Sequence, residues 1–501
     1  MMFREIMGTT NFPIWHPFSN DWWTFATLFL MILFLVGISE LTLRFEWWSS
    51  HTNRKLVHII VGLLVSITPL IFENRIQPAL LAAIFIILNG IALRKHSFKG
   101  IHSQEQKSYG TVFFPLGFLI VVVCFWNYPI YIIISMTILA LSDPMAAFVG
   151  QKATNPKRYI IWAETKSIEG SITMLVSSIL LTWGIILFFF PDNHAFFYIM
   201  IAFFTGITAT VSEGLSFRGS DNLSIPILII LFLEIFLSKT AEGTVTEYLK
   251  FAFLIIFIFI IAYRKQSLTE DGLIGAMIMG LLIYGLGGYQ YIVPLFIFFI
   301  LSSILSHIII IKPKDQHLSP RRNIIQVYSN GGIAMILVIM DHFNPQPWIY
   351  PAFIASVTTA MADTWGTEIG KLSSRKPVDI ITFKSLQTGD SGGITMVGTI
   401  GSLFGAIVLG LVGYVFGIPG TITLLIILSG FTSALFDSII GGTVQARFIC
   451  CTTSDISEKR VIKNRKGYLY TGWNWINNDM VNLLSTICGP CLFVILLYYL
   501  S

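Results

Sequence analysis

Charged residues are scarce in this sequence. Asp, Glu, Lys and Arg make up 12% of the 501 residues, whereas hydrophobic residues make up 54%. Ordinary soluble domains carry about 25% charged residues, so the composition excludes the three soluble domains that the length alone would suggest. The net charge of +5 is then a matter of membrane topology, and no nucleic-acid partner is expected.

Three further absences narrow the possibilities. The five cysteines give no disulfide framework, and Cys488-Gly-Pro-Cys491 lies inside an apolar segment without a βαβ context, which favours small-residue helix packing over a redox dithiol. No GxxxxGK[ST] pattern occurs, and Gly285 to Gly288 has no helix-opening lysine, so a P-loop kinase is excluded. No cleavable signal pattern precedes the first apolar stretch.

Long apolar runs dominate the remaining sequence and predict an all-α polytopic membrane protein with about 16 transmembrane helices. The expected segments are 22–43, 55–72, 77–93, 110–126, 128–149, 167–190, 195–212, 224–239, 247–263, 271–285, 289–311, 325–341, 347–370, 391–415, 419–443 and 480–500. With both termini outside, every lysine and arginine except Arg4, Arg75, Lys239 and Lys250 falls in an inside loop. The positive-inside rule predicts this asymmetry.

The sequence also predicts an internal duplication. After a polar leader at residues 1–21, the polar loop Lys239 to Lys250 separates two membrane domains, 22–240 and 247–501. Asp363 follows Asp143 by 220 residues, and the shared ending GSITM/GGITM places Gly392 opposite Gly170. Because each half has an even number of spans, we expect two parallel eight-helix repeats.

The strongest polar motif of the first half runs from Leu141 to Met174. Because proline disfavours helical geometry in the residue before it, we expect a helix break at Asp143 that exposes a carboxylate and carbonyls suited to Mg²⁺. Lys166, Glu169, Gly170 and Ser171 open the next helix and could form a phosphate cradle. The alternative is a boundary helix with a capping glutamate.

More polar residues follow on the same predicted face. Glu213 ends the seventh segment, and the loop after it contains Arg218, Asp221 and Asn222. Asp143, Glu169, Glu213 and Asp221 could hold a metal ion while Lys166 and Arg218 neutralise phosphates, a division of roles that phosphoryl transfer requires.

Two earlier motifs are weaker candidates for phosphate binding. Arg54, Lys55 and His58 lie on the first turns of the second segment, where snorkelling side chains are the alternative explanation. Gly110 and Thr111 start the fourth segment and could present N–H groups to an anion, or could simply begin a helix.

The second half carries corresponding residues. Asn330 and Gly331 stand where Gly110 and Thr111 stood, Asp363 ends the fifth helix of the repeat and Asp437 ends the seventh. Its sixth helix is expected to start within Lys384 to Gly393, and its eighth near Asp479. From this set we predict phosphate contacts, metal ligands and catalytic groups at the following positions: Asn330, Gly331, Asp363, Lys384, Asp390, Gly392, Gly393, Asp437 and Asp479.

The motifs RKLVHIIVG, SYGTVFFP, LSDPMAAFVGQ, TKSIEGS and GSDN in the first half resemble the dolichol kinase and phytol kinase family. The motifs QVYSNGG, ADTWGTEIGKL, TGDSGG, FDSIIGG and NNDMVN in the second half resemble the phytyl-phosphate kinase family. The first resemblance implies nucleotide and metal binding by Asp143, Lys166, Glu169 and Asp221, and the second implies the same for Asp363, Asp390 and Asp437. Lys384 aligns with Lys166 only through a shift of four residues.

Together these features predict a bifunctional membrane kinase. It would convert a long-chain isoprenoid alcohol, such as phytol or geranylgeraniol, to the monophosphate and then the diphosphate, with CTP or ATP as donor, Mg²⁺ as cofactor and both sites facing the cytoplasm. One alternative is a cytidylyltransferase acting on a lipid phosphate. A transporter is the alternative from another class, although transporters place ionisable residues near the bilayer midplane.

Overall fold

A computed structural model describes residues 13–95, 108–191, 195–309, 321–387, 390–450, 456–458, 460–462 and 465–500. Most of the leader 1–21, most of the basic loop 94–107, and Thr388 and Gly389 of the TGDSGG motif lie outside the described residues. The chain divides into two compact units, Met1–Tyr248 and Leu249–Ser501, called unit 1 and unit 2 below. The division falls within the segment Lys239 to Lys250, which was predicted to be a polar loop but is helical except at Gly243 and Thr244.

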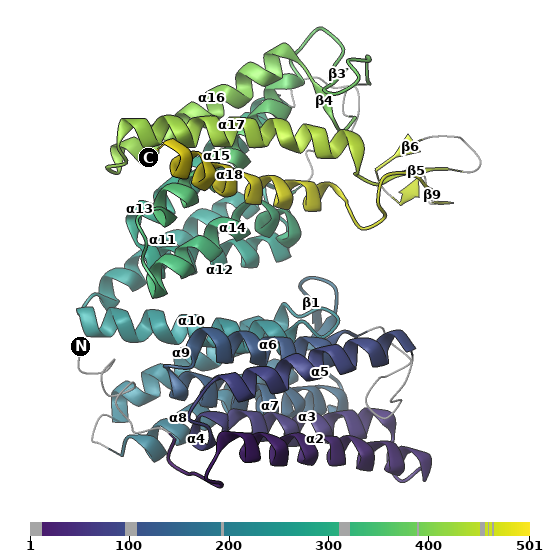
Figure 1. Ribbon diagram of the computed structural model, residues 1–501, viewed down its shortest axis with the longest axis vertical. Coiled ribbons are helices and arrows are strands. Elements are labelled where there is room, and N and C mark those ends of the chain that lie inside the picture. Colours follow the sequence, from purple (N-terminus) through teal and green to yellow (C-terminus); the bar gives the residue numbers. More distant parts are fainter. Residues whose placement is uncertain are drawn as a thin grey trace. The chain divides into compact units, whose positions relative to one another are not determined.

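Unit 1 is a bundle of helices that lie side by side (Figure 1). Its helices are α2 (Asp21–Arg44), α3 (Ser50–Ser66), α4 (Thr68–Ile71), α5 (Ile76–Lys95), α6 (Gly110–Phe125), α7 (Pro129–Lys152), α8 (Ile168–Phe189), α9 (Ala195–Gly214) and α10 (Asp221–Glu242). One antiparallel hairpin, β1 (Arg158–Ile160) with β2 (Thr165–Ser167), connects α7 to α8.

Unit 2 is also built from helices, with short strands in two of its loops (Figure 1). The helices are α11 (Val245–Arg264), α12 (Glu270–Gly287), α13 (Tyr289–Ile309), α14 (Ile324–Phe343), α15 (Ile349–Gly370), α16 (Met396–Val415), α17 (Gly420–Thr443) and α18 (Asn478–Leu500). The strands are β3 (Val378–Asp379), β4 (Gly393–Ile394), β5 (Arg447–Ile449), β6 (Ile456–Ser457), β7 (Val461–Ile462), β8 (Arg465–Lys466) and β9 (Tyr468–Thr471).

The predicted fold class is confirmed. Each of the sixteen apolar segments is helical, and the second one is divided at Ile67 into α3 and the short α4. Within the described residues, thirteen helices are long and apolar enough to cross a membrane, and α6 is a shorter apolar helix. Long continuous helices satisfy their own backbone hydrogen bonds, which a segment in lipid requires.

The predicted helix break at Asp143 is wrong. Helix α7 continues through Pro144 to Lys152, and in the same way α15 continues past Asp363 and α17 past Asp437. Proline inside a membrane helix is tolerated where neighbouring helices satisfy the backbone. The imidazole of His58 on α3 contacts the Leu139 carbonyl, next to the Ala140 carbonyl that Pro144 leaves without its helical donor. The aspartates therefore project from the last turns of unbroken helices.

The loops that precede α8, α16 and α18 contain the strands, which periodicity in the sequence did not indicate. β3 pairs with β4, and β5 pairs with both β6 and β9. The expected start of α16 within Lys384 to Gly393 is also wrong, because α16 begins at Met396 after Thr395 caps the Gly398 N–H. The strands β5, β6 and β9 extend beyond the helices near the start of α18 (Figure 1).

The two units share the packing of their last five helices and differ in the two helices before them. Every principal pairing among α6 to α10 has a counterpart among α14 to α18. In unit 1, however, α3 packs on α7 and α5 on α6, whereas in unit 2 α12 packs on α14 and α13 on α15. Gly62 allows the close approach of α3 to α7, because a Cβ there would lie 2.6 Å from the Ala140 Cβ.

Candidate functional site

In unit 1, polar residues from four elements meet at one end of the bundle. Lys166 of β2 donates hydrogen bonds of 2.7 Å to Oε1 of Glu213 on α9 and 2.7 Å to Oγ of Ser216. The Asp143 carboxyl on α7 interacts electrostatically with Asp221, Lys166 and Glu213. The structure thus brings together four of the residues that the sequence singled out, and Asp221 supplies the start of α10.

Lys166 carries the positive charge of this cluster. Burial lowers the pKa of its ammonium group, but the charge and hydrogen bond of Glu213, together with the charges of Asp221 and Asp143, outweigh burial and raise the pKa above its ordinary value. The side chains of Lys166 and Glu213 are only 15% and 11% exposed. Lys166 therefore stays protonated at neutral pH and holds Glu213 in a fixed position.

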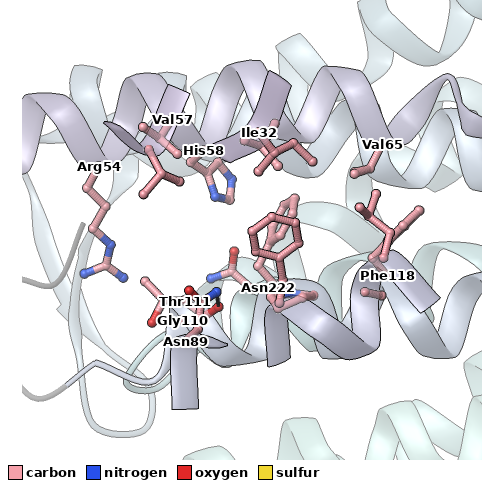
Figure 2. A pocket seen from close by; sticks show the side chains of 17 residues that line it. Ile32, Arg54, Val57, His58, Val65, Asn89, Gly110, Thr111, Phe118 and Asn222 are labelled. Carbon is pink, nitrogen blue, oxygen red and sulfur yellow. Dashed lines mark hydrogen bonds between the residues drawn. The ribbon is translucent and has the colours of Figure 1, made fainter. Parts of the chain in front are cut away.

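An apolar pocket lies beside the cluster, between α2, α3, α5, α6 and the start of α10. It encloses about 790 Å³ of space between atoms, including its open mouth. Figure 2 shows Arg54, Thr111 and Asn89 at one end, and Val65 and Phe118 at the other. The remaining wall is mainly aliphatic and aromatic, formed by Ile32, Val36, Val57, Val61, Leu81, Ala82, Phe85, Phe114 and Pro115.

The polar end of this pocket is tightly built around Gly110. The Arg54 guanidinium donates a 2.9 Å hydrogen bond to Oγ of Ser108, and a Cβ on Gly110 would lie 2.9 Å from that guanidinium and 3.0 Å from the Asn222 amide nitrogen. Gly110 begins α6, as predicted. Ser108, which the sequence analysis passed over, thus fixes Arg54 at the mouth of the pocket.

Asn222 links the pocket to the carboxylates. Its amide nitrogen donates to Oδ1 of Asp221 (2.8 Å) and to the Gly219 carbonyl (3.1 Å). Its side-chain oxygen is buried and has no hydrogen-bond partner within the described part of the chain. Buried oxygens without partners are rare in native proteins, so this atom is a candidate acceptor for a ligand in the pocket.

His58 and Lys55 occupy different surroundings, although the sequence placed them together. Nε2 of His58 lies 2.9 Å from the Leu139 carbonyl, and because a carbonyl only accepts, Nε2 carries a proton. His58 lines the pocket beside Phe114. Lys55 instead contacts the Gln151 side chain at 3.4 Å in an exposed position and does not line the pocket.

The Glu169 carboxylate binds the loop between α7 and α8 and does not join the predicted metal cluster. Its two carboxylate oxygens accept the backbone N–H of Lys157 at 3.1 and 3.2 Å. The Gly170 N–H is capped by Ser167, and the Ser171 hydroxyl lies 2.6 Å from the Tyr159 hydroxyl. These contacts secure the hairpin against α8, so the predicted cradle at Gly170 and Ser171 is occupied by internal hydrogen bonds.

Arg218 lies in the tight loop before α10. It has a positive φ of 49°, its N–H donates to Glu164 (2.6 Å), and its guanidinium lies over the Phe217 ring. Its side chain is exposed. Arg218 is therefore placed to shape this loop and to meet a ligand only from the solvent side.

In unit 2, Asp363 of α15 and Asp437 of α17 lie close enough to interact electrostatically. Both line the same polar pocket, together with Asn478 of α18. Oδ2 of Asp437 is buried without a hydrogen-bond partner, and neither aspartate has an ion pair within the described residues. The pair differs in this respect from Glu213, which has Lys166 beside it.

Three adjoining pockets surround this aspartate pair. An apolar pocket is lined by α11 to α14, with Phe259, Met279, Leu295 and Phe298 among its residues. It shares Arg322, Gln326, Asn330 and Thr364 with the polar pocket of the aspartates. That pocket in turn shares Asp363, Thr367, Lys371, Asp437 and Asn478 with a third, which contains Asp390, Gly392 and Gly393.

Some of the residues predicted for the site of unit 2 line these pockets, and others do not. Asn330 and Gly331 line the apolar pocket, and Gly392 lies against α17, where a Cβ would be 2.5 Å from the Gly442 Cα. Asp390 lines the third pocket, but its carboxylate accepts the Gln387 N–H. Asp479 does not line these pockets, because Asn478 and Asn482, on the same face of α18, do so instead.

The cation predicted at Lys384 is replaced by others. Lys384 is exposed and is absent from the pocket walls, whereas Lys371 and Arg375 line the third pocket. Arg322 and Gln326, also missed, line the pockets nearer the helices. The adjacent basic pair before α14 was the available signal for Arg322, but a positive-inside loop gives the same pattern.

The donor sets fit Mg²⁺ only in part. Within the described residues, no three His, Cys, Asp or Glu side chains form a group that could hold a metal ion. Mg²⁺ is usually bound by one or two carboxylates together with substrate phosphates, and Asp143 with Asp221, or Asp363 with Asp437, provides such a pair. Glu213, predicted as a ligand, is engaged by Lys166.

Comparison with known proteins agrees with these membrane units. The family described as "Integral membrane protein DUF92" matches residues 253–490. An uncharacterized membrane protein of Methanocaldococcus jannaschii is 30% identical over 234 residues, which cover 46% of this chain and 87% of that protein. No solved structure is significantly similar to the chain.

Other relatives have a name that describes an activity. A phytol kinase of Synechocystis is 32% identical over 202 residues, 38% of this chain and 82% of that protein. A probable chloroplastic phytol kinase 1 of Oryza sativa is 26% identical over 208 residues, 36% of this chain and 63% of that protein. The chain belongs to the DUF92 family of integral membrane proteins and has phytol kinases among its homologues.

Proposed function

We propose that the chain is a membrane kinase that phosphorylates a long-chain isoprenoid alcohol in unit 1 and the resulting monophosphate in unit 2. One observation carries the proposal. In each unit an apolar pocket adjoins, through polar side chains, a pair of partly buried aspartates. A hydrophobic acceptor needs an apolar pocket, and a metal-bound nucleotide needs carboxylates beside it.

The homologues support the reaction and the acceptor class. The relatives from Synechocystis and Oryza sativa are named phytol kinases, and phytol is a long-chain isoprenoid alcohol. Because a shared fold does not determine the reaction, the residues of the site have to support the activity as well. The pocket of unit 1 has the apolar wall that an isoprenoid tail requires.

In unit 1 the tail would lie between Val65 and Phe118, with the hydroxyl at Asn222. The unpartnered oxygen of Asn222 accepts the hydroxyl proton in a hydrogen bond and orients the oxygen toward the γ-phosphorus. The new O–P bond forms as the β,γ-bridging bond breaks and the nucleoside diphosphate leaves. The hydroxyl proton moves from its hydrogen bond with Asn222 to a carboxylate of Asp143 or Asp221.

The charged residues stabilise the transferred group. Lys166 and Arg54 neutralise developing phosphate charge from fixed positions, since each is held by a neighbouring side chain. Asp143 and Asp221 in unit 1, and Asp363 and Asp437 in unit 2, would each hold Mg²⁺, which would supply further neutralisation. The predicted inside location of most lysines and arginines supports sites on the cytoplasmic face.

The test uses purified protein with Mg²⁺, labelled CTP or ATP, and phytol, geranylgeraniol, farnesol or dolichol. The proposal predicts a prenyl monophosphate, then a diphosphate, with release of a nucleoside diphosphate. Release of pyrophosphate with a nucleotide-linked lipid would identify a cytidylyltransferase instead. If neither alcohols nor their monophosphates acquire label from either nucleotide, the proposed function is wrong.

A further inference from the structure

Arg322 is held rigidly at the entrance to the apolar pocket of unit 2. Its N–H donates to the Ser267 carbonyl (3.0 Å), and its carbonyl accepts the Thr269 N–H (3.1 Å). The guanidinium lies 5.9 and 5.7 Å from the ring centres of Phe298 and Phe299. Backbone contacts and aromatic rings thus fix one cation against an apolar wall.

Arg322 lies where the apolar pocket and the polar pocket of unit 2 meet. Arg322, Gln326 and Asn330 line both the apolar pocket and the polar pocket that contains Asp363 and Asp437. Gln326 and Asn330 lie one turn apart on α14 and therefore share a face. A molecule with its tail in the apolar pocket would present its head group to these three side chains.

The other side of the aspartate pair has a different character. Asp363 and Asp437 also line the third pocket, which contains Gly392, Gly393 and Lys371, and Arg322 does not line it. From one pocket to the next, the apolar wall is followed by Arg322 and then by the two aspartates. The loop that contains Gly392 and Gly393, called the glycine loop below, comes last. This order suits a lipid acceptor on the Arg322 side and a nucleotide donor on the glycine side.

The charge of Arg322 has an incomplete partner within the protein. Its electrostatic neighbour is Glu368, but the Glu368 carboxylate already lies 2.9 Å from Nζ of Lys371. One carboxylate shared by two cations leaves positive charge at the pocket mouth. A guanidinium matches the oxygens of a phosphate with two parallel hydrogen bonds, and the surrounding aromatic rings strengthen that attraction by excluding water.

We propose that Arg322 binds the phosphate of a prenyl monophosphate in unit 2, with the prenyl tail between α11, α12, α13 and α14. The inference rests on the proposed function and specifies the acceptor of its second step. An uncharged alcohol cannot satisfy the guanidinium, so unit 2 selects the monophosphate over the alcohol. Gln326 and Asn330 add neutral hydrogen-bond donors on the same side.

The test measures binding without catalysis. Full-length protein in nanodiscs, without nucleotide or Mg²⁺, is titrated with geranylgeranyl monophosphate and separately with geranylgeraniol. Arg322→Gln is expected to weaken monophosphate binding roughly 10- to 100-fold, the usual worth of a charged hydrogen-bond pair, and to leave alcohol binding unchanged. Arg322→Lys should lose less of the affinity for the monophosphate. Arg321→Gln, which removes an adjacent exposed cation, is the matched control and should bind like the parent.

A photoreactive prenyl monophosphate independently identifies where the monophosphate binds. It should label residues of the apolar pocket, such as Met279 and Leu295, in the parent and not in Arg322→Gln, while thermal unfolding confirms that the variant is folded. Equal monophosphate binding by the folded Arg322→Gln variant and the parent overturns the inference, even if the parent transfers phosphate. Loss of binding in a parent-like fold supports it even if no transfer is found.

Discussion

Nζ of Lys166 lies 2.7 Å from Oε1 of Glu213 and 2.7 Å from Oγ of Ser216, which makes Glu213 part of an ion pair in place of the metal ligand that the sequence suggested. Breaking a buried pair by removing one partner costs about 3 kcal/mol or more, because the remaining charge is left uncompensated. Lys166→Met is therefore expected to lower thermal stability and to abolish transfer by unit 1.

The double variant Lys166→Met with Glu213→Gln separates these two effects. Removing both charges should recover part of the lost stability, because Glu213 no longer carries an unpaired charge while Asp143 and Asp221 still lack the charge of Lys166. It should not recover transfer. Thermal unfolding and the unit 1 assay measure the two outcomes. Recovery of transfer by the double variant would contradict the role assigned to Lys166.

The same pair predicts a pH dependence. The pKa of Lys166 in the folded protein is raised above its ordinary value of 10.5, so its contribution to stability is fully present below pH 10.5 and is lost as the pH rises through the folded pKa. The stability difference between the parent and Lys166→Met should be constant from pH 7 to 9 and should shrink above about pH 10.5. A difference that shrinks toward neutral pH would place Lys166 in another environment.

Separate variants of the two aspartate pairs should divide the reaction. Asp143→Asn is expected to abolish monophosphate formation and still convert supplied monophosphate to diphosphate, because unit 2 has its own pair. Asp363→Asn should let the monophosphate accumulate. Chromatography of labelled products distinguishes the two, and variants that both behave like the parent would refute the assignment of the sites.

The apolar pocket of unit 1 should set the length of the alcohol. Val65 is 3% exposed and lines the far end of the pocket, so Val65→Phe fills space that a long tail needs. We expect the KM for geranylgeraniol to rise about tenfold and the KM for farnesol to change less. Val123→Phe, on an exposed face of α6, is the control, and an equal effect of the two substitutions would argue against a tail in this pocket.

The glycine loop of unit 2, which contains Gly392 and Gly393, gives a further test. Gly392 has a φ of +84°, and a Cβ there would lie 2.5 Å from the Gly442 Cα, whereas Gly417 has a φ of +93° with open space around it. Both alanine variants incur a left-handed strain of about 1–2 kcal/mol, but only Gly392→Ala also displaces the loop from α17.

Kinetics of monophosphate phosphorylation read out that difference. Gly392→Ala should raise the KM for the nucleotide several-fold beyond any effect of Gly417→Ala, because the loop borders the third pocket. Equal nucleotide KM values for the two variants would remove the loop from nucleotide binding.

The helices were predictable because lipid allows few alternatives. A run of about 20 apolar residues has to satisfy its own backbone, so every predicted segment is found as helix. The convergence of Asp143, Lys166, Glu213 and Asp221 followed from the same topology, since their segments all end on one side. Proline at 144 misled the prediction because the local preference before proline is weaker than the packing of α7 among its neighbours.

The details of the sites depended on tertiary contacts that spacing does not encode. Glu169 looks like a site acid in sequence, yet its carboxylate caps the Lys157 N–H across a hairpin. Arg322 looks like a topological charge, yet it stacks on Phe298 and Phe299, which lie more than twenty residues earlier. The exchange in packing of the second and third helices between the units was equally invisible.

Each apolar pocket is enclosed by helices of its own unit alone. Under the proposed function, the intermediate therefore passes from the pocket of unit 1 to the pocket of unit 2. Unlabelled prenyl monophosphate added during the reaction should then dilute the label that reaches the diphosphate, and diphosphate should appear only after a lag. The monophosphate would be dissolved in the lipid bilayer between the two steps.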